Sequence, residues 1–492
     1  MNGDLILIFQ NYWKWKRDLV ITFNITIRDE SGDAIYESTN NKPKLINSIS
    51  IKELFKKYIP NQFVERGVVE IEIFSKDNIV FPFPAVMGFY KSKNSLTSAV
   101  HTAGRTLEKP LEEEHFFSET NFFISTNKNF RPFVNIFNGP SGAIKDLRIL
   151  IMEKNNPEPI KVINETPLLK PYESRTIFID NKNLSNKNKH GEVNNLSIFD
   201  DAVNYFLKIQ GKYTSIFPRF VCGNLDIINK HYCVTHTYRE IDFSGDKLEN
   251  CFGIEKRSSV SLPLVKDVIN LKTVIYPTSS SEENSVSFHL NKLDDLQKES
   301  ISFVKDLSVK KCGLNSIIID SEKTSGFFLS AAPNNKSGEL PARIHVNCMY
   351  YLKNKMKTLP SDISHQLTAH LSKPKSNYWF NGIVSKGYKN LILGSSVTSE
   401  SFLKRNSEPI EFSLIIRLEK KDINLTKFYK FGGDGNNSFV LCIEDIFRKE
   451  NIKIFDEDVF SWRIVMKEGK MGAIYCLSYN EELGCIYGEH SF

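Results

Sequence analysis

Short stretches that alternate apolar and polar residues recur along the whole chain, and they constrain its fold more than any other feature. Residues 19–32 (LVITFNITIRDESG), 68–81 (VVEIEIFSKDNIVF) and 133–142 (FVNIFNGPSG) alternate and then break at Ser, Asn, Asp, Gly or Pro. A period of two with such breaks is typical of half-buried strands that end in turns. The same pattern occurs at 147–159, 285–291, 413–422 and 461–479.

Helical patterns are few and short. They are clearest in 50–59, 199–210 and 442–450. The chain has 492 residues, which is too many for one core, and at ~100–200 residues per domain it should contain three to five units. Short strands separated by turns about every ten residues favour β-sandwiches. We therefore predict an all-β chain of tandem β-sandwiches with a few short helices.

Four segments share a strand–turn–strand pattern that ends at a histidine. They are 83–102, 217–237, 327–347 and 473–491, and their histidines are His101, His236, His345 and His490. In the first three segments a leading Phe precedes the histidine by 18, 19 and 18 residues, and the fourth segment is shorter. Because strand register decides where a side chain lies, we expect the four histidines at equivalent places near the end of the last strand of four similar units.

A second shared piece precedes each of these segments. It consists of a polar residue, two or three apolar residues and a charge, and it occurs at 48–55, 175–181, 315–321 and 439–447. The same order of features in four places indicates tandem repetition. We expect four β-sandwich units, or two pairs of such units, at 1–110, 111–255, 256–350 and 351–492.

The second unit has a distinctive succession of pieces. Residues 129–153 hold two strands around an Asn-Gly turn, 168–180 is a Pro-containing segment that ends in Ile-Asp, and 215–240 is a hairpin whose last strand carries His236-Thr237. With these pieces the unit resembles the sensory rhodopsin transducer family, and His101-Thr102 matches the same His-Thr pair in the first unit. The resemblance implies small β-sandwiches that assemble as tetramers, so four copies in one chain would be a covalent version of that assembly. It implies no rhodopsin partner here.

The four repeated histidines are the first candidates for a site. Neutral imidazoles that converge near a shared axis could bind a metal ion or another ligand, or act in acid–base chemistry. One histidine per repeat is also what structural repetition produces, with each imidazole capping a sheet edge or bonding to its own loop. We favour the structural interpretation and predict no metal and no cofactor.

The loop at 101–117 combines residue types that are common in binding and catalytic sites. Its Arg105 could clamp a carboxylate or phosphate, and its Glu112–Glu114 run could bind a divalent metal or catalyse proton transfer together with His101. The alternative is a solvated connector whose charges pair with one another. The second unit repeats the theme with a histidine and an arginine. The candidate ligand-binding residues are therefore His101, Arg105, Glu112, Glu114, His236 and Arg239.

Three other segments have simpler interpretations. FGGDGNNS at 431–438 lacks the lysine and long helix of a phosphate-binding loop, so we predict a hairpin turn. WKWKR at 13–17 could stack on bases or sugars or touch a membrane surface, but we predict the exposed edge of an N-terminal strand. Residues 357–377 are predicted to be a loop-like stretch that leads into the fourth unit, with a linker at 365–370. No nucleophile elbow, zinc-protease motif or dinucleotide fingerprint is present in the sequence.

Charge and cysteine content bound the partners and the compartment. A net charge of +6 over this length is close to neutral and implies no specific nucleic-acid partner. No stretch approaches the ~18 apolar residues of a membrane span, and the first residues lack the pattern of a signal peptide. The eight cysteines form no CxxC pair. We predict a reduced, cytoplasmic protein without disulfides or a transmembrane segment.

These observations favour a non-catalytic binding or assembly protein. Sandwich faces rich in Tyr, Phe and Asn would suit a carbohydrate or surface polymer, which is an argument from fold analogy. One alternative is a metal-assisted enzyme that acts on a glycan or small metabolite through His101, Arg105 and Glu112–Glu114. The other is a signalling scaffold that docks another protein on its repeats.

Overall fold

The computed structural model confirms the all-β fold. Strands dominate the described residues, and the three helices among them have eight residues or fewer. The structure describes residues 3–491 except 61–63, 65, 78, 80–84, 93–94, 102–103, 108–109, 121–123, 126–128, 154–157, 164–167, 181–204, 240–247, 251–257, 276–285, 295–304, 310–314, 320–323, 334–336, 342–343, 354–357, 368–376, 399, 402–407, 422 and 433–436.

The first unit consists of two antiparallel sheets, in the orders β4-β1-β6-β7 and β3-β2-β5. Its strands are β1 (Gly3–Gln10), β2 (Thr22–Asp29), β3 (Ala34–Asn40), β4 (Ile46–Ser50), β5 (Gly67–Phe74), β6 (Met87–Ser92) and β7 (Ser95–His101). Helix α1 (Tyr12–Arg17) follows β1, and helix α2 (Ile51–Tyr58) follows β4.

The second unit has the same two-sheet construction. One sheet has the order β14-β10-β17-β18, and the other has the order β12-β11-β15-β9-β19, with β13 also paired to β11. The strands are β9 (His115–Thr120), β10 (Phe130–Phe137), β11 (Ile144–Glu153), β12 (Lys161–Ile163), β13 (Leu168–Leu169), β14 (Ser174–Phe178), β15 (Tyr205–Tyr213), β17 (Val221–Asp226), β18 (Tyr232–His236) and β19 (Tyr238–Arg239).

The third unit pairs its strands as β25-β22-β28-β29 and β21-β26-β23-β24. They are β21 (Ser258–Pro263), β22 (Ile269–Ile275), β23 (Val286–Lys292), β24 (Lys305–Val309), β25 (Asn315–Ile319), β26 (Gly326–Pro333), β28 (Ile344–Leu352) and β29 (Ser361–Leu367). Two further sheets have only two short strands each. One pairs β8 (Arg105–Thr106) with β16 (Ile216–Phe217), and the other pairs β20 (Leu248–Asn250) with β27 (Glu339–Pro341).

The fourth unit has the orders β34-β31-β36-β37 and β30-β35-β32-β33. Its strands are β30 (Asn377–Ile383), β31 (Lys389–Ser395), β32 (Ile410–Leu418), β33 (Ile423–Phe431), β34 (Ser438–Cys442), β35 (Val459–Glu468), β36 (Ala473–Asn480) and β37 (Cys485–His490). Helix α5 (Ile443–Lys449) follows β34, as α2 follows β4 in the first unit.

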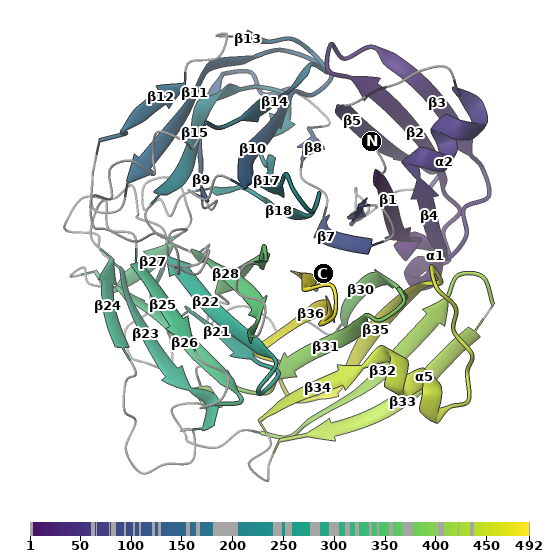
Figure 1. The fold of residues 1–492 in the computed structure, drawn as a ribbon, viewed down its shortest axis with the longest axis vertical. Coiled ribbons are helices and arrows are strands. Elements are labelled where there is room, and N and C mark those ends of the chain that lie inside the picture. The colour runs from purple at the N-terminus through teal and green to yellow at the C-terminus, as the bar shows by residue number, and fades with distance from the viewer. Residues whose placement is uncertain are drawn as a thin grey trace.

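The four units share one connectivity. If the strands of a unit are counted from one to eight, one sheet joins strands five, two, seven and eight, and the other joins strands four, three, six and one. The first unit lacks strand one among the residues described. The four pieces at 48–55, 175–181, 315–321 and 439–447 fall on strand five of each unit. Figure 1 shows the units following one another around a ring, with the C-terminus at its centre.

One predicted boundary cuts through a sheet. The expected limit of the third unit at residue 350 lies within β28, and β28 pairs with β29, which extends to Leu367. The segment 357–377, predicted to be a loop-like lead into the fourth unit, therefore supplies the last strand of the third unit. The pattern misled because SDISHQL contains two charged or ionisable side chains that are nevertheless buried against neighbouring units.

Two local predictions were also wrong. Of the helix expected at 199–210, the described part is strand β15, which lies between β11 and β9. Pairing on both edges overrides the helical spacing of its apolar residues. Residues 13–17, expected to form a strand edge, belong to α1, in which Asn11 caps the first turn by accepting a hydrogen bond from the Lys14 amide.

In each unit, strand eight is buried on nearly its whole length and on both faces of its sheet. On β1, Leu7 packs in the core of the first unit, whereas Ile8 packs in a cluster formed mainly by the fourth unit. The eighth strands meet around the centre of the ring, where β7 contacts β18 and β37, and β29 contacts the same two strands. Side chains at the ends of these four strands are therefore brought together from segments far apart in the sequence.

Candidate functional site

Three of the four repeated histidines end the eighth strand of their units. His101 ends β7, His236 ends β18 and His490 ends β37. Each lies opposite a residue of strand seven, which is Met87, Val221 and Tyr475 respectively. The shared register places the three imidazoles at equivalent positions, as the hairpin pattern predicted.

The third unit departs from the prediction. His345 lies near the start of β28, which is strand seven, and not at the end of strand eight. In the third unit, the row of paired residues that corresponds to the histidine rows of the other units runs through Ser316, Val274 and Asn347. It ends at Ser364 on β29, so a serine stands at the place where the other units have a histidine. The segment 327–347 runs from β26 to β28, which belong to different sheets. The spacing from aromatic residue to histidine does not distinguish such a connection from a hairpin within one sheet.

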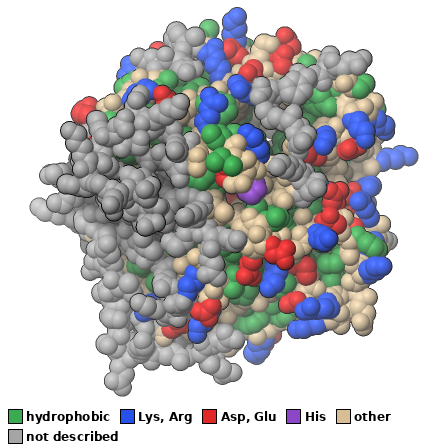
Figure 2. All heavy atoms as spheres, in the orientation of Figure 1, with side chains coloured by type: hydrophobic (Ala, Val, Ile, Leu, Met, Phe, Trp, Pro, Cys, Tyr) green, Lys and Arg blue, Asp and Glu red, His purple; other side chains and the backbone are tan. Residues whose placement is uncertain are grey.

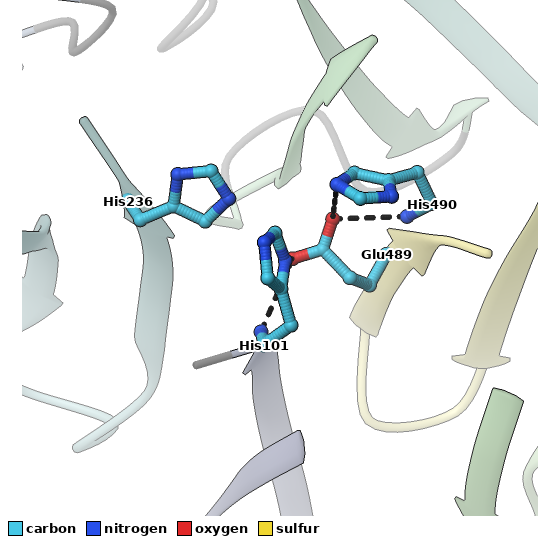
Figure 3. A group of neighbouring side chains, drawn as sticks. All are labelled: His101, His236, Glu489 and His490. Atoms are coloured by element: carbon cyan, nitrogen blue, oxygen red, sulfur yellow. Dashed lines mark hydrogen bonds and ion pairs between the residues drawn. The ribbon is translucent and has the colours of Figure 1, made fainter. Parts of the chain in front are cut away.

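The three equivalent histidines converge with Glu489 at the centre of the ring. One nitrogen of each imidazole and one carboxylate oxygen lie within 4.8 Å of one another. The imidazole centroid of His101 is 4.2 Å from that of His236 and 4.6 Å from that of His490. His101, His236 and Glu489 are buried, and the His490 side chain is 27% exposed. Figure 3 shows the Glu489 carboxylate between His101 and His490.

Hydrogen bonds to backbone carbonyls fix the tautomers of two imidazoles. Nδ1 of His236 lies 3.0 Å from the carbonyl oxygen of Thr237, and Nδ1 of His490 lies 3.1 Å from that of Ser491. A carbonyl oxygen can only accept, so Nδ1 carries the proton and Nε2 is left as the atom with a lone pair. The residue after each histidine, which the sequence showed as Thr or Ser, therefore orients the imidazole through its main chain.

Polar side chains from the second and fourth units complete the cluster. Arg219 Nη1 donates to His101 Nε2 at 3.2 Å, and Glu489 Oε2 lies 3.1 Å from His101 Nδ1. The Tyr238 hydroxyl lies 3.3 Å from His490 Nε2, and the Arg219 guanidinium lies over the Tyr238 ring at 5.0 Å. These contacts tie the first, second and fourth units together at the axis.

Burial favours the neutral form of two of these imidazoles, His101 and His236. It holds the pKa of His101 well below its ordinary value, with the charge of Arg219 acting in the same direction. Burial does the same for the pKa of His236, together with the neighbouring His101 and Arg219. Burial also raises the pKa of Glu489, which the adjacent His490 opposes. The cluster therefore presents imidazole lone pairs, which can act as ligands for a cation.

The other two histidines near the centre have aromatic partners. His345 stacks on Tyr238 at 4.0 Å between centroids, and Tyr238 in turn lies 4.3 Å from His236. His365 on β29 lies 3.0 Å from the Tyr350 hydroxyl, and burial lowers its pKa to about 3. These two histidines flank the cluster without contributing to its set of four ligand atoms.

The acidic loop lies apart from this cluster. Glu112 and Glu113 are exposed, and Glu114 forms an ion pair with Lys145, whereas His101 is buried with Arg219 and Glu489. Arg239 is an exposed residue of β19, opposite Glu119. Arg105 is in β8, and its side chain lies outside the described residues. The structure thus brings His101 and His236 together, with Glu489 and Arg219 beside His101, whereas the interpretation favoured from the sequence had each imidazole bonding within its own unit.

Three residues of the cluster escaped the sequence analysis. They are Arg219, Tyr238 and Glu489. A signal was available for two of them, because Tyr238 follows His236-Thr237 and Glu489 directly precedes His490. Arg219 had no signal, since its contact with His101 spans 118 residues and two units.

No disulfide joins the six cysteines that the structure describes, Cys222, Cys233, Cys348, Cys442, Cys476 and Cys485. Cys222 lies opposite Thr235 and Cys233 opposite Asn224, so the two do not face each other directly. Cys251 and Cys312 lie outside the described residues. Among the helices described, none has the length and apolar character needed to cross a membrane.

Comparison of the chain with models of known families and with curated proteins found no match. The functional argument therefore depends on the geometry of the central cluster alone.

Proposed function

We propose that this chain is a non-catalytic, metal-binding scaffold, in which His101, His236, His490 and Glu489 hold one divalent transition-metal ion between three units of the ring. The observation that carries this proposal is the convergence of four potential ligand atoms within 4.8 Å from strands of the first, second and fourth units. An ion bound there would cross-link segments separated by more than a hundred residues in sequence.

The donor set favours zinc or a similar ion. Imidazole nitrogen and carboxylate oxygen are ordinary zinc ligands, whereas calcium and magnesium prefer oxygen. A tetrahedral site with Zn–N bonds of about 2.05 Å has ligand atoms about 3.3 Å apart. The observed limit of 4.8 Å requires shifts of roughly 1 Å on binding. Four protein ligands would fill a tetrahedral site and leave no position for substrate, which favours a structural role over catalysis.

Arg219 opposes the ion in two ways. Its guanidinium is a nearby positive charge, and it donates to His101 Nε2 at 3.2 Å, a nitrogen that could otherwise bind metal. The metal would therefore have to displace this hydrogen bond. The carboxylate of Glu489 compensates part of the repulsion because it lies 3.1 Å from the same imidazole.

The buried cluster suits a metal ion better than the carbohydrate or surface polymer suggested by composition. Its donors converge on a point, whereas sugar recognition uses an open aromatic face. The ring of four sandwich units is also consistent with the assembly implied by the resemblance to the sensory rhodopsin transducer family, and that relationship remains a prediction.

Calorimetric titration of the metal-free full chain with zinc tests the proposal. We expect one ion per chain and a loss of affinity of at least about 100-fold for His236→Ala, which removes one ligand. His345→Ala is the matched control, because this histidine stacks on Tyr238 but offers no ligand atom to the set. Unchanged affinity in His236→Ala, or an equal loss in both variants, would contradict the proposal.

Arg219→Gln provides a second arm of the same titration. Removing the charge and its hydrogen bond to His101 should tighten zinc binding by about tenfold, since one competing charge-assisted hydrogen bond is lost. A purely structural network would instead lose stability in this variant and show no zinc binding in either form.

A further inference from the structure

Helix α1 of the first unit lies against the outer sheet of the fourth unit. Figure 1 shows α1 beside β30 and β35. The Tyr12 ring lies 6.4 Å from that of Trp379 on β30, and the Arg463 guanidinium of β35 lies 4.3 Å from the centre of the Trp15 ring. The WKWKR segment forms the first-unit side of this junction and takes no part in the central histidine cluster.

Strand register places a group of polar residues in the row next to the two residues that contact the helix, Trp379 and Arg463. Asn381, Ser461 and Arg417 are partners in one row across β30, β35 and β32. Trp379 and Arg463 are partners in the adjacent row on the same face. Ser461 lies between Asn381 and Arg417 and has the shortest side chain of this row. The two longer polar side chains therefore stand on either side of it, on the neighbouring strands.

Several hydrogen-bonding groups at this junction are buried without a partner among the described residues. They are Nε1 of Trp15, Nε of Arg463, and both amide atoms of Asn381, whose side chain is completely buried. A buried polar group without a partner costs about 1–3 kcal/mol. Such groups normally find partners in folded proteins. Three of these four atoms, Trp15 Nε1, Arg463 Nε and Asn381 Nδ2, are donors, so their clustering indicates an occupant that mainly supplies acceptors.

Two positive charges at the junction also lack a counter-ion. Neither Arg417 nor Arg463 forms an ion pair in the described part of the chain, and both are half-buried. Burial lowers the pKa of both guanidinium groups, and Arg417 lowers that of Arg463 further. These two like charges lie on neighbouring strands, in adjacent rows of the same face, and an anion between them would stabilise both.

We infer that this junction binds the phosphate group of a small ligand through Arg417, Arg463, Asn381 and the indole N–H of Trp15. Guanidinium groups match the oxygen pairs of phosphate in a forked geometry. The two positive charges of Arg417 and Arg463 match the two negative charges of a terminal phosphate. A carboxylate would neutralise only one of them. Exposed Lys16 and Arg17 on α1 add positive potential near the junction, which favours the approach of an anion.

Thermal unfolding of the full chain, with EDTA present to exclude metal effects, tests this site. Inorganic phosphate at about 10 mM should raise the midpoint of unfolding relative to chloride of equal ionic strength. In Arg417→Gln the apparent affinity should fall by at least about tenfold, because a charge-assisted contact is lost. Arg448→Gln, which alters an exposed arginine of the same unit, should behave as the wild type. No phosphate-specific shift, or equal shifts in wild type and Arg417→Gln, would overturn the inference.

Asn381→Asp gives an independent readout. The new carboxylate should pair with the two guanidinium groups, so the variant should unfold at a higher temperature without ligand and no longer respond to phosphate. Lower stability together with an unchanged phosphate response would overturn the proposed position of the anion. If acetate stabilises the wild type as well as phosphate does, the site takes a carboxylate, and the assignment to phosphate is wrong.

Discussion

Replacing Gly488 with alanine should lower the free energy of unfolding by about 3 kcal/mol, since a side chain has no room at this point of β37. A Cβ atom at Gly488 would lie 2.2 Å from the carbonyl oxygen of Cys476 on the paired strand β36. It would also lie 3.0 Å from Ile363 of β29, in the third unit. The substitution therefore strains both the β36–β37 pairing and the contact between the third and fourth units.

Gly88→Ala is the matched control for this prediction. Gly88 lies on β6, in the corresponding sheet of the first unit, and its nearest neighbours would be the flexible ends of Leu5 and Leu7, at 3.3 and 3.7 Å. We expect a loss below about 1 kcal/mol there. Denaturant unfolding of both variants measures the difference. Equal losses would show that close packing at the axis does not limit stability.

The sequence predicted those features that depend on local pattern. The all-β class followed from alternation, and the strand-five pieces marked equivalent strands in all four units. The equivalence of His101, His236 and His490 followed from hairpin register. Each of these signals lies within about twenty residues, where the period of a strand and the geometry of its turn decide the outcome.

The features that escaped prediction depend on contacts between units. His345 was assigned to the wrong strand because a connection between sheets has the same local pattern as a hairpin. The convergence at the axis depends on how β7, β18, β29 and β37 meet, which no local spacing specifies. The contacts of Arg219 with His101 and of Trp15 with Arg463 span 118 and 448 residues. A single sequence carries no signal for such pairs.

Replacing Asp362 with asparagine should raise the free energy of unfolding at pH 7 by about 1–3 kcal/mol, because the neutral amide removes the cost of burying a carboxyl group that tends to ionise at this pH. Asp362 lies on β29 at 3% exposure, and neither carboxylate oxygen has a hydrogen-bond partner in good geometry among the described residues. Burial raises the pKa of Asp362 well above its ordinary value, Glu489 of β37 adds to the shift, and Asn347 of β28 opposes it. Cys222 and Cys233 of the second unit also face this carboxyl group.

The sign of the pH dependence follows from the raised pKa. In the unfolded chain the carboxyl loses its proton near pH 3.8, whereas in the folded chain it retains the proton to higher pH. The contribution of Asp362 to the stability of the wild type therefore falls as the pH rises above the pKa that this carboxyl group has in the unfolded chain. The advantage of Asp362→Asn should be small near pH 3.5 and should grow towards pH 7, as denaturant unfolding at both pH values would show.

Asp226→Asn is the contrasting control, because Asp226 accepts hydrogen bonds at 2.9 Å from the amides of Ile228 and Asn229, and its neutral replacement should lower stability. A gain for Asp362→Asn that does not depend on pH would show that the buried carboxyl is not the source of the cost.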